Sequence, residues 1–257
     1  MIDLDKHFSK ISQDQLKKFN SLIQLYKSWN SKVNLISRKD IDNLYVNHIL
    51  HSLSIAKVHE FIDGSDILDV GTGGGLPGIP LAILFPKVNF TLLDSISKKI
   101  KVVEDISKQL SLTNVKTVND RAENHNLKYD FIISRAVSKM DGFYSMVNKN
   151  IKLKSRSNIP NGIISLKGGD LKDELKNFND YKIFEISEFF SNDFFNTSNA
   201  SYYNLYMWLH RKKGDVEPAT QVIDLNRQAV FTCSVVGWPV ESTSWYKNGY
   251  PLHVSHR

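Results

Sequence analysis

The stretch Ile67-Leu68-Asp69-Val70-Gly71-Thr72-Gly73-Gly74-Gly75-Leu76-Pro77-Gly78 joins a short apolar run to a loop with five glycines in eight residues. A short apolar run that ends in glycines is typical of a β-strand that turns into a helix. Glycines permit positive φ angles and let the backbone approach a ligand closely. The alternative is a purely structural tight turn with no ligand, but a single turn needs fewer glycines. The stretch therefore predicts a ligand site at the carboxyl end of a strand.

The spacing of the glycines indicates which ligand to expect. A dinucleotide fingerprint requires glycine at its sixth position, where this chain has Leu76, and a Walker loop requires Gly-Lys-Ser/Thr, which is absent. In the pattern present, Asp69 stands two residues before Gly71, and Gly73 and Gly75 follow at the same interval. This pattern is typical of class I methyltransferases. Their cofactor, S-adenosylmethionine, carries an ammonium and a sulfonium, which a nearby carboxylate favours. We therefore expect this cofactor at the loop.

Asp94 is the second candidate for cofactor binding. It ends the next strand-like run, 19 residues after Gly75. An acid near this spacing can accept hydrogen bonds from both ribose hydroxyls of a nucleoside. The alternative is an acid that stabilises the N-terminus of the following helix. Asp94 also fits a dinucleotide site, so the glycine spacing decides between the two cofactors.

Strand-like and helical patterns alternate through the middle of the chain, which predicts parallel β-α-β units and a doubly wound sheet. Two later runs, 181–188 and 203–210, have no long helix between them, which predicts an antiparallel edge. Two helical patterns, 12–30 and 40–61, precede the sheet, and Ser12 with Gln15 forms a candidate capping box. The other expected strands are 66–70, 90–94, 115–118, 131–134 and 163–167, and the other expected helices are 77–85, 97–110 and 140–151.

Composition and charge limit the classes to which the protein can belong. No signal-peptide pattern opens the chain, no run of about 18 apolar residues occurs, and Cys233 is the single cysteine. We therefore expect a cytoplasmic protein. The net charge is +6, and residues 214–257 hold three basic and four acidic residues, so the rest of the chain has a larger basic surplus. That surplus fits a polyanionic partner, although a Lys-rich surface gives the same composition.

Several motifs together resemble the bacterial family of small-subunit ribosomal RNA guanine-N7 methyltransferase G, also called glucose-inhibited division protein B. The resemblance covers residues 1 to about 213, and its most specific part is the glycine loop extended by Leu-Pro-Gly-Ile-Pro. Two positions depart from the family pattern: His51 stands where an acid is frequent, and Gly74 stands where a proline is frequent. The motifs are residues 71–81, 92–95 and 132–136, with Asn34-Leu35, His48-Ile49-Leu50 and Leu166-Lys167-Gly168.

The resemblance implies a fold and a cofactor site. The fold is that of a class I methyltransferase, with a doubly wound, mostly parallel seven-stranded sheet and N-terminal helices. The cofactor is S-adenosylmethionine, and no metal is implied. Read alone, Ala122-Glu123 would be a surface loop and Arg135 a solvated side chain near the cleft. The implied cofactor contacts are Gly71 and Leu76, Asp94 on the ribose, Ala122-Glu123 beside the adenine and Arg135 at the rim, with Gly73 and Gly75 in the same loop.

The implied reaction is methyl transfer to N7 of a guanine in 16S ribosomal RNA, the small-subunit rRNA, by a protein that we expect to be a monomer. N7 has an in-plane lone pair and no proton, so we assign no catalytic proton-transfer residue. Basic side chains could hold the RNA, although in isolation the lysines after Asp94 are most often a solvated helix face. The candidates are Lys98, Lys99 and Lys101, then Arg135, Lys139 and Lys167.

The C-terminal segment follows a different pattern. Cys233 and Trp245 are spaced as in the B and C strands of an immunoglobulin domain, and the surrounding sequence resembles the Down syndrome cell adhesion molecule family. The second cysteine and the tyrosine corner are missing. We therefore expect three regions: an N-terminal helical region (1–62), a cofactor-binding domain (63–213) and a truncated immunoglobulin-like tail (214–257), joined in a chimeric gene model. The alternative for the tail is a family-specific extension.

Two other functions compete with RNA methylation. The first is a class I methyltransferase that acts on a small molecule or a protein, against which the basic charge and the extended glycine loop argue. The second is a cell-adhesion fragment, judged from the tail. The absence of a signal-peptide pattern and of a complete immunoglobulin domain argues against it.

Overall fold

A computed structural model of the 257-residue chain provides the structure. The chain divides into two compact units, Met1–His210 and Arg211–Arg257. No helix among the described residues is long and apolar enough to cross a membrane. The described residues are 4–37, 40–135, 139–156, 159–168, 171–178, 181–190, 204–209, 245–247 and 250–252.

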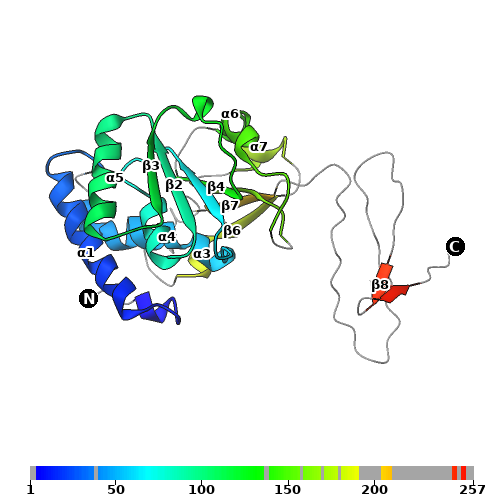
Figure 1. The fold of residues 1–257 in the computed structure, drawn as a ribbon, viewed down its shortest axis with the longest axis horizontal. Coiled ribbons are helices and arrows are strands. Elements are labelled where there is room, and N and C mark those ends of the chain that lie inside the picture. Colours follow the sequence, from blue (N-terminus) through cyan, green and yellow to red (C-terminus); the bar gives the residue numbers. More distant parts are fainter. Residues whose placement is uncertain are drawn as a thin grey trace. The chain divides into compact units, whose positions relative to one another are not determined.

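A seven-stranded sheet forms the centre of the first unit, in the order β3-β2-β1-β4-β5-β7-β6 (Figure 1). The strands from β3 to β5 are parallel to their neighbours, whereas β7 runs antiparallel to both β5 and β6. The predicted doubly wound sheet with an antiparallel edge is therefore confirmed. The strands are β1 (Asp66–Val70), β2 (Asn89–Asp94), β3 (Val115–Asn119), β4 (Phe131–Arg135), β5 (Gly162–Lys167), β6 (Tyr181–Glu185) and β7 (Asn204–Leu209).

Two hydrophobic cores cover the two faces of this sheet. Alternate residues of a strand point to opposite faces, and accordingly Ile67 and Ile133 belong to one core while Leu68 and Ile132 belong to the other. The first core also takes in α1 (Gln13–Asn30), α4 (Gly78–Leu84) and α5 (Ser97–Gln109), and the second takes in α6 (Met140–Val147) and α7 (Lys172–Leu175).

The N-terminal helix α1 begins at the predicted capping box. The Ser12 hydroxyl accepts from the Gln15 backbone at 3.2 Å, and the Gln15 side chain accepts from the Ser12 backbone at 2.8 Å. The side-chain amide group of Gln15 also donates to the carbonyls of Ile83 and Leu84, each at 2.9 Å. These carbonyls at the C-terminus of α4 would otherwise lack donors. The helix α1 therefore lies along α4, and it contacts α5 as well (Figure 1).

The single helix predicted over 40–61 is wrong in detail. Side-chain hydrogen bonds contribute to this difference. Ser52 and Ser54 donate their hydroxyls to the carbonyls of His48 and His51, at 2.6 and 2.7 Å. Such bonds compete with regular helical hydrogen bonds. His59 then adopts an extended conformation, with φ of −145°. The segment comprises η2 (Ile41–Asn43), the π-helical turn η3 (Tyr45–Leu50), α2 (His51–Leu53) and α3 (Ile55–Val58).

Short 3-10 turns shorten two other predicted elements. The expected helix 140–151 continues after α6 only as η5 (Asn148–Asn150), and the expected strand 181–188 ends in η6 (Ile186–Glu188). Two more such turns are η1 (Leu4–Lys6) and η4 (Ala122–Asn124).

In the second unit, the structure describes one two-stranded antiparallel pair, β8 (Trp245–Lys247) with β9 (Tyr250–Leu252). Cys233 and the expected B strand lie outside the described residues. The three-region division and the immunoglobulin-like tail stay predictions.

Candidate functional site

The glycine loop leaves the carboxyl end of β1 and is held against β2. Gly71 and Thr72 donate their backbone N–H groups to the carbonyl of Leu93, at 2.9 and 3.0 Å. Gly75 has a φ of +95°, and a Cβ there would lie 2.4 Å from Cδ1 of Ile79. A side chain at position 75 would therefore strain the loop and crowd Ile79.

Asp69 lies directly under the loop and is fully buried. Its Oδ2 accepts from the Thr72 hydroxyl at 2.6 Å and from the Gly78 N–H at 2.9 Å. A Cβ on Gly78 would lie 2.7 Å from that oxygen. Burial raises the pKa of Asp69 to about 7, against the opposing effect of these hydrogen bonds. Its Oδ1 has no hydrogen-bond partner among the described residues, so a cation at this edge would favour the ionised carboxylate.

Asp94 meets the same loop from the end of β2. Its Oδ2 accepts from the Gly73 N–H at 2.9 Å, and its Oδ1 accepts from the Ile96 N–H at 2.8 Å. Asn119, which ends β3, donates to the Asp94 carbonyl at 2.9 Å. Each carboxylate oxygen has two lone pairs, so Asp94 retains capacity for two further donors. The structure thus brings Asp94 and the glycines together, as the sequence predicts.

Ala122 and Glu123 lie in η4, which follows β3 at the same edge of the sheet. Ala122 is buried, in the same cluster as Leu93 and Val70, while Glu123 is exposed. The Glu123 carbonyl accepts from Lys149 at 2.5 Å. Leu76 is also buried, after Gly75 in the loop. Ala122 and Glu123, expected beside the adenine, and Leu76, expected to contact the cofactor, therefore share the edge with Asp94, although these contacts stay predictions.

Arg135 is the last residue of β4 and is half-buried. Its register neighbour on β5 is Leu166, so it lies at the carboxyl edge, next to the end of β1. Its guanidinium acts electrostatically on Asp69, Tyr26 and His48. The rim position implied for Arg135 fits this neighbourhood. The three residues after it lie outside the described part of the chain.

Sequence reasoning missed Tyr26. This buried side chain on α1 donates its hydroxyl to the carbonyl of Gly74 at 2.9 Å. A Cβ on Gly74 would lie 3.3 Å from Leu35, so the loop is also packed against the segment after α1. A tyrosine on the apolar face of an amphipathic helix is the available signal, because a buried hydroxyl usually needs a partner. The N-terminal helix therefore supports the glycine loop from behind.

The predicted RNA-binding lysines differ in their surroundings. Lys98 and Lys101 are exposed on α5, Lys99 is half-buried there, and Lys139 is exposed before α6. Lys167, at the end of β5, is only 8% exposed and forms an ion pair with Glu174. Its charge is therefore partly neutralised within the protein, in contrast to the exposed positions. RNA contact by these residues stays a prediction.

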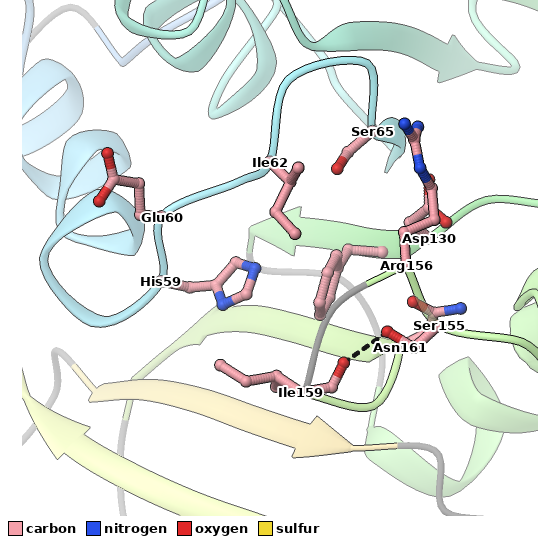
Figure 2. A pocket seen from close by; sticks show the side chains of 10 residues that line it. His59, Glu60, Ile62, Ser65, Asp130, Ser155, Arg156, Ile159 and Asn161 are labelled. Atoms are coloured by element: carbon pink, nitrogen blue, oxygen red, sulfur yellow. Dashed lines mark hydrogen bonds between the residues drawn. The ribbon is translucent and has the colours of Figure 1, made fainter. Parts of the chain in front are cut away.

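A cavity of about 270 Å³ lies at the opposite, amino-terminal edge of the sheet (Figure 2). Ser65 precedes β1, Phe131 begins β4 and Asn161 precedes β5, and all three line it. His59 also lines it, and burial lowers the pKa of this imidazole to about 4. None of the predicted site residues lines this cavity. It is separate from the edge where the glycine loop and Asp94 meet.

Comparisons with known proteins show what the chain is similar to. The family model described as rRNA small subunit methyltransferase G, GidB, matches residues 15–199. The ribosomal RNA small subunit methyltransferase G of Christiangramia forsetii is 54% identical over 77% of this chain and 94% of its own length. That of Flavobacterium psychrophilum is 51% identical over 78% and 96%. A SAM-dependent methyltransferase structure from Aquifex aeolicus aligns over 67% of this chain and 98% of its own, with 15% identity and a TM-score of 0.48.

The matched residues include the loop above Asp69, Asp94 at the end of β2 and Arg135 at the end of β4. The length of the match and the identity to the relatives exceed what a shared fold alone requires. The chain therefore belongs to the GidB family of rRNA small subunit methyltransferases G.

Proposed function

We propose that the protein transfers the methyl group of S-adenosylmethionine to N7 of a guanine in 16S ribosomal RNA. The observation that carries the proposal is the junction of the glycine loop with Asp69 and Asp94 in a member of this family. The junction supplies backbone space for a nucleoside and two acidic side chains for its hydroxyls and its ammonium. The related proteins are named ribosomal RNA small subunit methyltransferase G, which supports the proposal.

The residues at the junction fit this cofactor. The nearest heavy atom to a Cβ on Gly73 would be 4.0 Å away, so the backbone there is open to a ligand. Asp94 would hold the ribose hydroxyls, and Asp69 would stabilise the ammonium through the oxygen that has no described partner. Ala122 and Glu123 would lie beside the adenine, and Leu76 would contact the cofactor. The bound cofactor supplies an electrophilic methyl group on a sulfonium.

The chemistry at N7 needs alignment rather than proton transfer. The nitrogen attacks with a lone pair that is already free, and no proton leaves it during the reaction. Holding two reactants in line can lower a barrier by roughly 7–11 kcal/mol. The rigid loop, fixed by Asp94 and Tyr26, provides such alignment for the cofactor. The target base must also leave its stack, which costs a few kcal/mol.

Exposed lysines near the same edge support an RNA substrate. Lys98 and Lys101 follow Asp94 on α5, and Lys139 precedes α6. They would anchor phosphates that flank the target base, while Arg135 is closer to the cofactor. Because the loop, both acids and Arg135 come from one chain, we take the active species to be a monomer. We infer from this substrate that the protein acts in the cytoplasm.

The test is to incubate the purified chain with methyl-labelled S-adenosylmethionine and small ribosomal subunits that lack the modification. We expect one labelled N7-methylguanosine in 16S RNA, found by nuclease digestion and mass spectrometry. Raising the salt concentration should weaken RNA binding steeply, with a log–log slope of about −0.7 per phosphate contact for single strands. Label on a protein or a small molecule instead of RNA, with a flat salt response, would contradict the proposal.

A further inference from the structure

A second group of residues lies on the segment that replaces the predicted helix 40–61. His48 belongs to the π-helical turn η3, and His51 begins α2 directly after it. The side chain of His48 is 12% exposed. Single π-helical turns occur frequently at functional sites. This turn is therefore a candidate part of the functional site.

Both ring nitrogens of His48 are buried and have no hydrogen-bond partner among the described residues. Oδ2 of Asp40 lies 3.7 Å from its Nε2, beyond hydrogen-bond distance. Asp40 is itself fixed, because its Oδ1 accepts from the Asn47 side chain at 2.8 Å. A buried polar atom without a partner costs about 1–3 kcal/mol. Such a cost is offset if a ligand supplies the missing partner.

The charge of Arg135 acts both on His48 and on the expected cofactor site at the carboxyl ends of the strands. Arg135 acts on His48 and His51, and the same guanidinium acts on Asp69 beneath the glycine loop. Burial, with the Arg135 charge in support, lowers the pKa of His48 to about 4. The imidazole is therefore neutral at physiological pH, with one nitrogen that donates and one that accepts.

This pair of groups matches the edge of guanine that adjoins N7. Guanine presents the acceptor O6 beside N7, and its N1–H donor follows O6 on the ring. Adenine presents the opposite order, with a donor amino group at the position of O6. His48 offers a donor, and the Asp40 carboxylate 3.7 Å away offers an acceptor. A neutral donor also avoids repulsion with the positive charge that N7 methylation places on the base.

We propose that His48 binds the target guanine by donating a ring N–H to O6, while Asp40 accepts from N1–H, so that this pair selects guanine over adenine. The proposal rests on the proposed function, since it assigns the base-recognising residues of that same site. His48 would touch the substrate but not the cofactor.

His59 offers a matched control for a substitution of His48. It is also a buried imidazole with a nitrogen that lacks a described partner, and burial likewise lowers its pKa to about 4. It packs against Phe61 and Phe131 and lines the cavity at the opposite edge of the sheet (Figure 2). Replacing it tests the effect of losing a buried histidine without touching the guanine site.

The experiment compares the full-length wild type with His48→Leu, His48→Gln, Asp40→Asn and His59→Leu. Three quantities are measured for each: the melting temperature, the affinity for S-adenosylhomocysteine by calorimetry, and the single-turnover rate on unmethylated small subunits. We expect His48→Leu and Asp40→Asn to bind the cofactor product within two-fold of the wild type. Their methylation rates should fall roughly ten- to a hundred-fold, as expected when a base-specific hydrogen bond is removed.

The control variants make the outcome decisive. His48→Gln keeps a neutral donor and should recover part of the rate, whereas His59→Leu should keep the wild-type rate at temperatures where it stays folded. Equal rates for His48→Leu and the wild type would overturn the proposal, and so would a loss confined to cofactor affinity. If His48→Leu does not fold, Asp40→Asn decides, and a rate for it within two-fold of the wild type would also overturn the proposal. A wild type that forms no N7-methylguanosine would refute the proposed function itself.

Discussion

Substituting alanine at Gly75 tests whether the loop path is as constrained as its geometry indicates. The new Cβ would lie 2.4 Å from Cδ1 and 2.8 Å from Cγ1 of Ile79, which is fully buried and cannot turn away freely. Overpacking of this kind costs about 1–3 kcal/mol. The φ of +95° adds roughly 1–2 kcal/mol for a residue with a side chain. We expect Gly75→Ala to lose about 2–5 kcal/mol of unfolding free energy in total.

Thermal unfolding followed by circular dichroism measures this loss, and calorimetry with S-adenosylhomocysteine measures the effect on the site. Each kcal/mol lowers the melting temperature of a domain of this size by about 2–4 °C. Gly142→Ala is the matched control, because a Cβ there meets nothing within 4 Å and alanine favours the helix α6. A Gly75→Ala variant as stable as Gly142→Ala, with wild-type affinity, would refute the reasoning.

Three further predictions concern the loop, its acid and the RNA surface. Tyr26→Phe leaves the Gly74 carbonyl without its donor, so the unfolding free energy should fall by about 1–3 kcal/mol, and an unchanged denaturant midpoint would contradict this. Folded Asp69 keeps its proton up to about pH 7 whereas the unfolded chain releases it near its ordinary value, so its contribution to stability falls as pH rises from about 4 to 7. Asp69→Asn should remove that part of the pH dependence, and denaturation series at several pH values that stay parallel for both proteins would exclude it. Replacing Lys98 and Lys101 by glutamine should reduce the salt slope of RNA binding by about 0.7 for each phosphate that the variant no longer binds, while an unchanged slope would remove these lysines from the RNA surface.

Local sequence patterns were sufficient for the parts of the fold that depend on neighbouring residues. The glycine loop needs positive φ angles, and only glycine adopts them readily, so the loop is visible in the sequence itself. The capping box at Ser12 and Gln15 also depends on residues three apart. The parallel direction of the strands from β1 to β5 follows from alternating strand and helix patterns. The approach of Asp94 to the loop follows from the parallel sheet, because the carboxyl ends of its strands share one edge.

The missed features depend on particular side-chain contacts, between residues 48 positions apart in one case and seven, four or three positions apart in the others. Tyr26 and Gly74 are 48 positions apart, and no local pattern pairs them. The ion pair between Lys167 and Glu174 required the fold after β5, since sequence alone presents Lys167 as one more surface cation. The break at Ser54, between α2 and α3, accompanies side-chain hydrogen bonds that compete with an otherwise convincing helical period.

The most direct test of the central claim is calorimetric titration of S-adenosylmethionine into the purified full-length protein and its Asp94→Ala variant. We expect one saturable site in the wild type. In the variant the affinity should drop by at least ten-fold, because charge-assisted hydrogen bonds to the ribose are each worth about 1.5–3 kcal/mol. No binding heat for the wild type with either the cofactor or its demethylated product, or equal affinity for both proteins, would contradict the site described at the ends of β1 and β2.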